Sequence, residues 1–193
     1  VTSLGTVLLP RAAYYIEHQQ MDEFKKLSRK ALNFVFLVAS PMMIYFMLFA
    51  KQGIYFLSGD AFGPAVVPMQ LIMPTLLLIG ITNILGIQIL VPLGYEKAVL
   101  VSEIVGAVID LVVNALLIPV YQSSGAAIGT LLAEFAVMVV QCIALKNEIK
   151  TAFSDIKYLK IILAIILASL ASFWVTELNL HVFITLVISA ILF

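Results

Sequence analysis

Long apolar runs are the feature that most constrains how this chain folds. The stretch from residue 98 to 119, for example, reaches the roughly 20 residues that a helix needs to cross a bilayer. Of the 193 residues, 63% are hydrophobic and only 11% are charged, whereas soluble domains have about 45–50% apolar and about 25% charged residues. Too few polar residues remain to cover a globule in water. We therefore predict an all-α integral membrane protein rather than a soluble helical domain.

About seven segments satisfy the length rule for a spanning helix, so we expect a polytopic transmembrane bundle. The predicted spans are residues 1–16, 31–57, 65–92, 98–119, 124–145, 159–176 and 181–193. The chain begins at Val1 and ends at Phe193 inside apolar runs. We interpret it as a fragment of a longer, transporter-sized protein, with its first and last spans truncated.

The positive charges follow the predicted spans. Of the eleven Lys and Arg residues, all but Lys51 flank the loops after the first, third and fifth spans. Such loops face the cytoplasm. We therefore predict a protein of the inner, cytoplasmic membrane, with residue 1 outside and the C-terminal end cytoplasmic. The first of these loops places Met21, Phe24 and Leu27 at helical spacing between cations, which predicts either a short amphipathic helix on the membrane surface or a solvated elbow.

One predicted span carries three polar residues on one side. Glu103 and Asp110 are seven positions apart and Asn114 follows four later, so all three project from nearly the same face of a helix. Asp110 lies near mid-membrane, where an ionised carboxylate facing lipid costs at least about 2.5–3.5 kcal/mol. We predict that these residues line a substrate or ion pathway. Alternatively, Asp110 and Asn114 hydrogen-bond to neighbouring helices and Glu103 is solvated at the interface.

Other polar residues lie inside neighbouring spans. Glu134 is ten positions after Ser124, and Asn83 and Gln88 lie in the span at 65–92. All three are candidates for the same pathway. The competing interpretation is that they hydrogen-bond across helices, as polar side chains inside membranes often do.

Small residues predict where two helices touch. Gly125, Gly129 and Ala133 repeat every four positions, a pattern that lets a neighbouring helix approach closely. The neighbour we expect is the preceding span, which is joined by the short loop "VYQSS".

Catalytic and metal-binding signals are lacking in the sequence. Cys142 is the single cysteine, and the two histidines lie at opposite ends of the chain, so no metal site is expected. No P-loop or nucleophile elbow is present. We expect neither an enzyme nor a cofactor, and we expect no nucleic-acid partner.

Three stretches together carry a family resemblance: "LGTVLLPRAA", "SPMMIYFMLFAKQGIYFLSGDAFGPAVVPMQLI" and "NALLIPVYQSSGAAIGT". Their order resembles the multidrug/oligosaccharidyl-lipid/polysaccharide flippase superfamily, and most closely the Wzx-type O-antigen flippases. The resemblance covers about residues 1–146, and residues 147–193 read as two additional spans. The chain departs from the family at Gln122, where members often have glycine, and at Asp110, where they often have asparagine.

The resemblance implies a fold of two helical lobes around a central cavity, of which this chain would form most of the C-terminal lobe. It implies transport of an undecaprenyl-pyrophosphate-linked oligosaccharide to the outer leaflet by alternating access, coupled to protons or sodium. Membrane lipids and the polysaccharide polymerase machinery are the implied partners. Carboxylates repel the pyrophosphate, so Arg11 and Lys51 are the candidate contacts to the anionic headgroup.

Three other functions remain open on the sequence. The chain could be a lipid II flippase, or a multidrug/cation antiporter that uses its buried acids to bind cations. It could also be a non-transporting membrane scaffold or the anchor of an enzyme. Acids and prolines inside the spans are unfavourable in a passive anchor, which needs only apolar residues.

Overall fold

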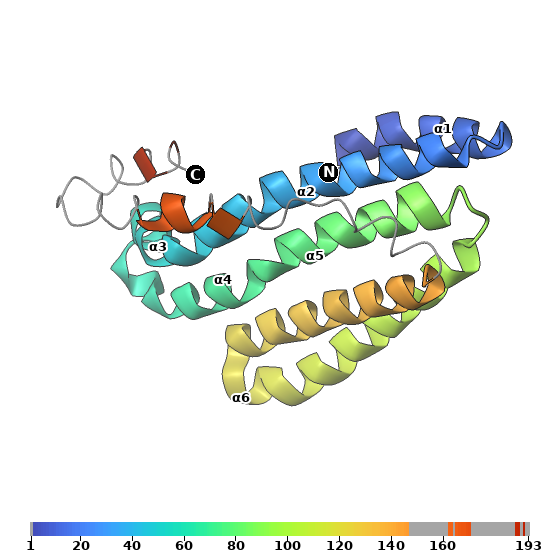
Figure 1. The fold of residues 1–193 in the computed structure, drawn as a ribbon. Coiled ribbons are helices and arrows are strands. Elements are labelled where there is room, and N and C mark those ends of the chain that lie inside the picture. Colours follow the sequence, from blue (N-terminus) through green and yellow to red (C-terminus); the bar gives the residue numbers. More distant parts are fainter. Residues whose placement is uncertain (1, 147–161, 164, 171–187, 190, 192–193) are drawn as a thin grey trace.

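Helices make up the described part of the chain. The computed structural model describes residues 2–146, 162–163, 165–170, 188–189 and 191. The elements are α1 (Thr2–Glu17), α2 (Met21–Leu48), α3 (Ala50–Ser58), the 3-10 helix η1 (Asp60–Ala65), α4 (Val66–Ile72), α5 (Pro74–Asn83), the π-helix η2 (Ile84–Leu90) and α6 (Glu96–Ala144) (Figure 1). These residues contain no strand, which confirms the predicted all-α class.

Three stretches within the described residues are long and apolar enough to cross a membrane: Met21–Leu48, Asp60–Leu90 and Glu96–Ala144. The last contains two helices, because the backbone at Gln122 is not helical. Together with α1, these segments account for the first five predicted spans. The predicted spans 159–176 and 181–193 lie mostly outside the described residues.

The second predicted span was wrong at its start. Helix α2 begins at Met21 rather than near residue 31, so the helical spacing predicted from Met21 is confirmed, but this helix continues directly into the span and the turn is confined to residues 18–20. Phe24 and Ser28 are buried on the same face as Ala31 and Val35, and this face continues through the span at helical spacing. The length rule counts only apolar residues, so it placed the start of the span after the basic residues. The basic residues belong to the same helix and lie away from its buried face.

The second span also has a break near its end. Helix α2 stops at Leu48, and the short helix α3 follows Phe49. Lys51 therefore lies on α3 and not on the spanning helix. Its ammonium nitrogen lies 5.6 Å from the centre of the Tyr55 ring, a cation–π contact at an exposed site.

The reversal inside α6 depends on one unusual residue. Gln122 has φ 50° and ψ −124°, a conformation that glycine adopts freely and other residues adopt at a cost. This is the position at which the resembling family often has glycine. The backbone requirement at this turn explains that preference.

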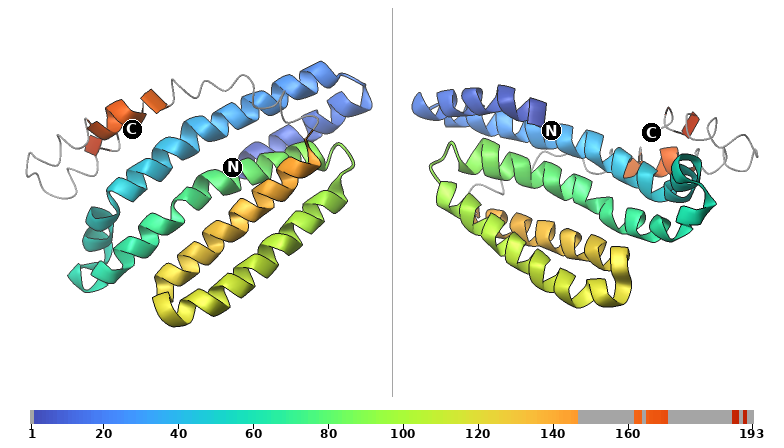
Figure 2. Two further views of the ribbon diagram at one scale, coloured as in Figure 1. Left: turned by 60° about the horizontal axis from the view of Figure 1, so that its bottom comes forward. Right: turned by 180° about the vertical axis from the view of Figure 1, so that it is seen from behind.

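The elements pack in a simple order. Helices α4 and α5 with η2 lie between α1–α2 on one side and the two halves of α6 on the other (Figures 1 and 2). The core forms where α1, α2 and η2 meet, and its most deeply buried side chains are Leu32, Ile84, Leu85 and Leu90. In η2 the wide turn is seen directly, since the Val91 N–H donates to the Gly86 carbonyl at 3.0 Å, five residues back. Wide turns of this kind are frequent at functional sites.

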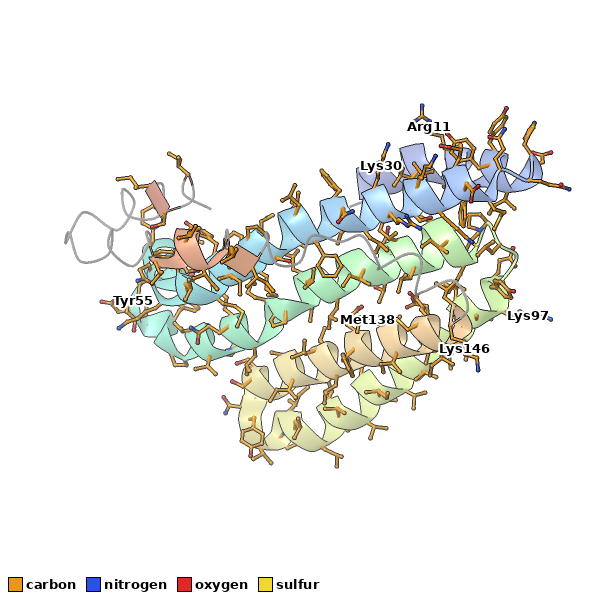
Figure 3. All side chains as sticks on the ribbon, in the orientation of Figure 1. Arg11, Lys30, Tyr55, Lys97, Met138 and Lys146 are labelled. Carbon is orange, nitrogen blue, oxygen red and sulfur yellow. The ribbon has the colours of Figure 1, made fainter. Side chains whose placement is uncertain are left out.

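The cations gather at one end of the bundle. Lys97 and Lys146 lie at the end where η2 connects to α6, Arg11 and Lys30 lie part-way along α1 and α2 in the half of the bundle nearer that end, and Tyr55 on α3 lies at the opposite end (Figure 3). All four cations are exposed. Residues far apart in the sequence thus form one basic end.

Candidate functional site

Close packing between the two halves of α6 builds the site. A Cβ atom added to Gly125 would lie 2.5 Å from the Leu117 carbonyl oxygen, and one added to Gly106 would lie 2.5 Å from Val137 Cγ2. At Gly129 an added Cβ would collide with the Asn114 side chain. The three glycines are buried. Only residues without a side chain allow the two halves to approach this closely.

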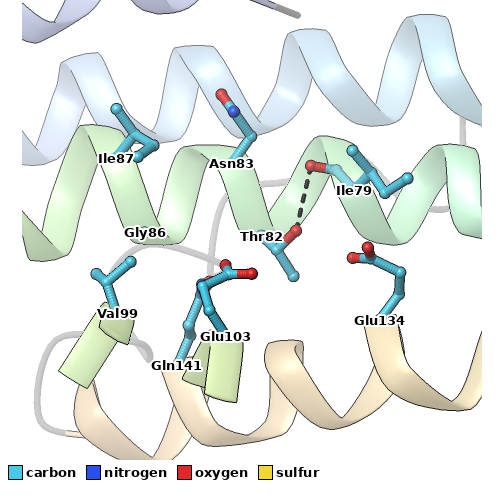
Figure 4. A pocket seen from close by; sticks show the side chains of 9 residues that line it. All are labelled: Ile79, Thr82, Asn83, Gly86, Ile87, Val99, Glu103, Glu134 and Gln141. Carbon is cyan, nitrogen blue, oxygen red and sulfur yellow. Dashed lines mark hydrogen bonds between the residues drawn. The ribbon is translucent and has the colours of Figure 1, made fainter. Parts of the chain in front are cut away.

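Two cavities open along this packed hairpin. The first, here the α5–α6 cavity, has a volume of about 250 Å³ and is lined by Ile79, Thr82, Asn83, Gly86, Ile87, Val99, Glu103, Glu134 and Gln141 (Figure 4). The second, here the hairpin cavity, has a volume of about 260 Å³ and is lined by Glu103, Gly106, Ala107, Asp110, Thr130, Ala133, Glu134 and Val137. Glu103 and Glu134 line both cavities, so the two form one polar track along α6.

Helical periodicity on both halves of α6 produces this track. Glu103 and Asp110 are seven positions apart on the first half. On the second half, Glu134 follows Thr130 by four positions and precedes Gln141 by seven. Spacings of four and seven keep side chains on one face of a helix. The turn at Gln122 folds the two polar faces toward the same cavities.

Two acceptors in the middle of the hairpin have no partner. Asp110 Oδ1 and Asn114 Oδ1 are buried and make no hydrogen bond within the described residues. Both residues lie half-buried on the first half of α6, one turn apart. A buried acceptor without a partner costs about 1–3 kcal/mol. Asp110 lines the hairpin cavity, so its free oxygen can accept a proton donor or a cation that enters there, whereas the Asn114 side chain packs against Gly129.

Gln141 belongs to the site, although the sequence analysis did not single it out. Its side chain is 1% exposed. Its Nε2 donates to Ser102 Oγ at 3.3 Å, and Ser102 Oγ in turn donates to the Val99 carbonyl at 2.7 Å. A Cβ atom at Gly86 would lie 3.0 Å from that Nε2, so the glycine leaves room for the amide. The signal that could have found Gln141 is its spacing of seven from Glu134.

Of the remaining predicted site residues, only Asn83 lies in a cavity with the predicted acids. Asn83 is half-buried and lines the α5–α6 cavity. Gln88 is 3% exposed within η2, with both amide atoms unpaired among the described residues, and it lines neither cavity. Arg11 and Lys51 are exposed and line neither cavity.

The described residues contain no group of three or more His, Cys, Asp or Glu that could hold a metal ion.

Comparison with known proteins identifies the family. The model of the family described as "Lipid II flippase MurJ" matches residues 1–193. The chain belongs to this family. Its membership confirms the flippase superfamily that the sequence resemblance indicated, and it does not support the O-antigen branch within that superfamily. No curated protein and no solved structure matches the chain.

Members of this family are transporters rather than catalytic enzymes. The family match and the long apolar helices together describe a multi-pass membrane protein that handles a lipid-linked substrate.

Proposed function

We propose that the protein moves lipid II across the cytoplasmic membrane by alternating access. The observation that carries this proposal is the match of the lipid II flippase family over residues 1–193. It favours this substrate over the O-antigen repeat unit that the sequence resemblance implied. The polar track supports the proposal physically, because a hydrophilic headgroup needs polar surface inside the membrane while its lipid tail stays in the bilayer.

The basic end of the bundle sets the proposed orientation. Lys97 and Lys146 lie at that end and Arg11 and Lys30 lie toward it (Figure 3), and positive residues near membrane helices prefer the cytoplasmic side. The turn at Gln122 then faces outward, and α1 enters from the outside. Arg11 would meet the anionic part of the substrate on the cytoplasmic side, and Lys51 would lie near the outer end.

Cation coupling forms part of the proposal. Asp110 lines the hairpin cavity and has a buried oxygen without a partner among the described residues, and Asn114, one turn further along α6, has another. A proton or a sodium ion bound there in one state and released in the other would bias the transport cycle. We therefore expect Asp110→Asn to reach the membrane at normal levels and to lower transport about tenfold or more. Transport that is unchanged between acidic and alkaline pH, and with or without sodium, would contradict this role.

Depletion of the protein in its host tests the substrate. If the proposal holds, lipid II accumulates in the inner leaflet and the cells lyse. Loss of surface polysaccharide with accumulation of its lipid-linked repeat unit, and without lysis, would instead identify an O-antigen flippase. New drug sensitivity with normal polymers would identify an antiporter. Complementation with Glu96→Gln, an exposed position outside both cavities, is the control for expression.

A further inference from the structure

The α5–α6 cavity is negatively charged and has no cation of its own. Glu103 and Glu134 both line it, and no Lys or Arg among the described residues does so. Carboxylates that share one cavity repel each other, and within a membrane this repulsion is screened less than in water. A positively charged guest would remove the repulsion.

A buried acceptor at the same place indicates the same kind of guest. Gln141 Oε1 has no hydrogen-bond partner among the described residues. Its amide is held in place because Nε2 donates to Ser102 Oγ, and its Oε1 is a buried acceptor whose hydrogen-bonding capacity is unused among the described residues. The Gln141 side chain rises from α6 toward the Glu103 carboxylate (Figure 4). Besides Thr82, whose hydroxyl donates to the Ile79 carbonyl, and Asn83, the cavity therefore offers two carboxylates and one fixed amide oxygen as acceptors.

The size and the apolar walls of the cavity restrict which kind of cation fits it. Its volume of about 250 Å³ is far larger than the roughly 30 Å³ of one water molecule. Ile79, Ile87 and Val99 supply apolar wall beside the acceptors, and such a wall suits a methylene stem that carries a charged tip. A primary ammonium group brings three N–H donors and no acceptor. A bare alkali ion would be bound by the oxygen atoms alone and would make no apolar contact with Ile79, Ile87 or Val99.

We propose that the α5–α6 cavity binds a primary ammonium group on an alkyl stem, carried by the headgroup of the transported lipid. The assignment of the ammonium group to a headgroup rests on the proposed function. The chemistry of the cavity does not depend on it. Glu103 and Glu134 bind the charge, Gln141 Oε1 accepts the third hydrogen bond, and the isoleucines contact the stem.

A binding experiment tests the cavity independently of transport. The protein, as its host expresses it, is unfolded thermally in detergent with butylammonium chloride or with sodium chloride at equal ionic strength. We expect butylammonium to raise the unfolding temperature of the wild type by about 2 °C or more. The double variant Glu103→Gln/Glu134→Gln should lose this shift, and Glu96→Gln should keep it. An equal shift with sodium chloride would overturn the ammonium assignment, as would a shift that survives in the double variant.

Single variants keep the test decisive if the double variant does not fold. Glu103 is exposed, so Glu103→Gln alone leaves the packing intact and should reduce the butylammonium shift by at least half. Gln141→Met removes the buried oxygen and should reduce it as well. A full shift in both folded variants would overturn the proposal.

A transport experiment tests the source of the ammonium group. Proteoliposomes receive two forms of lipid II that differ only in whether the side-chain amine of the peptide is free or acetylated. We expect the wild type to move the free amine about tenfold faster, since a hydrogen bond to a charged group is worth roughly that factor. The Glu103→Gln/Glu134→Gln variant should move both forms at the slower rate. Equal rates in the wild type would overturn the headgroup assignment, whereas no movement of either form by the wild type would reject the proposed function and leave the butylammonium result to decide the cavity.

Discussion

The apolar core and the α6 hairpin stabilise the molecule in opposite ways. In the core, where α1, α2 and η2 meet, branched side chains such as Leu32 and Leu85 are fully buried against one another. In the hairpin, glycines bring two backbones together, and polar atoms of Asp110 and Asn114 are buried without partners. The core gains van der Waals contact from large side chains, and the hairpin gains it by removing side chains. The core thus maintains the shape, and the hairpin is the part to which we assign the function in our proposal.

The largest expected effect comes from opening a hole in the core. Leu85 is 0% exposed, and Leu85→Ala should lower the free energy of unfolding by about 2–5 kcal/mol, because the surrounding helices cannot close the cavity. The matched control is Leu116→Ala in the hairpin, where the side chain is 67% exposed. Unfolding in detergent, followed by circular dichroism, measures both. A loss at Leu116 equal to the loss at Leu85 would show that the core does not dominate stability.

A smaller effect is expected from adding one methyl group to the hairpin. Gly125→Ala places a Cβ against the backbone at Leu117, which cannot move aside, and should cost about 1–3 kcal/mol. Gly129→Ala meets the Asn114 side chain instead, which can turn, so it should cost less and should lower transport by displacing that amide.

Gly53 on α3 is the control for the hairpin glycines, since a Cβ there meets nothing within 4 Å. Gly53→Ala should leave stability unchanged or raise it slightly, because alanine favours a helix over glycine. The same unfolding assay measures the stability of Gly125→Ala, Gly129→Ala and Gly53→Ala. If Gly125→Ala is as stable as Gly53→Ala, close backbone approach does not hold the hairpin together.

The smallest effect is a gain in stability at the hairpin turn. Gln122 adopts φ 50°, and Gln122→Gly should stabilise the protein by about 0.5–1 kcal/mol, because the strain relieved exceeds the added entropy of the unfolded chain. Ser123→Gly, at a neighbouring position with ordinary backbone angles, should be neutral or destabilising. A loss of stability in Gln122→Gly would mean that the side chain of Gln122 stabilises the turn more than its backbone strains it.

Much of the fold could be predicted from hydrophobic length and periodicity, with clear limits. The helical spacing of Met21, Phe24 and Leu27 was predicted, but the continuity of this helix with the span was not, because the charges between them were taken to mark the end of the span. The break at Phe49 and the wide turn in η2 have no signal in segment length or composition.

The candidate site could be predicted in part. Glu103, Asp110 and Glu134 were singled out because a carboxylate inside an apolar helix needs an explanation. Gln141 was overlooked because an amide among apolar residues is a weaker signal. Its importance comes from Ser102 and Gly86, which are distant in sequence and close in space.

The sequence by itself determined that the chain is helical, enters a membrane and carries polar residues at helical spacing, because these properties depend on local composition and on a period of 3.6 residues. Only the tertiary structure decided which polar residues share a cavity. That depends on the turn at Gln122 and on the glycines that bring the two halves of α6 into contact. Spacing along a helix defines a face, and the packing of helices decides what that face meets.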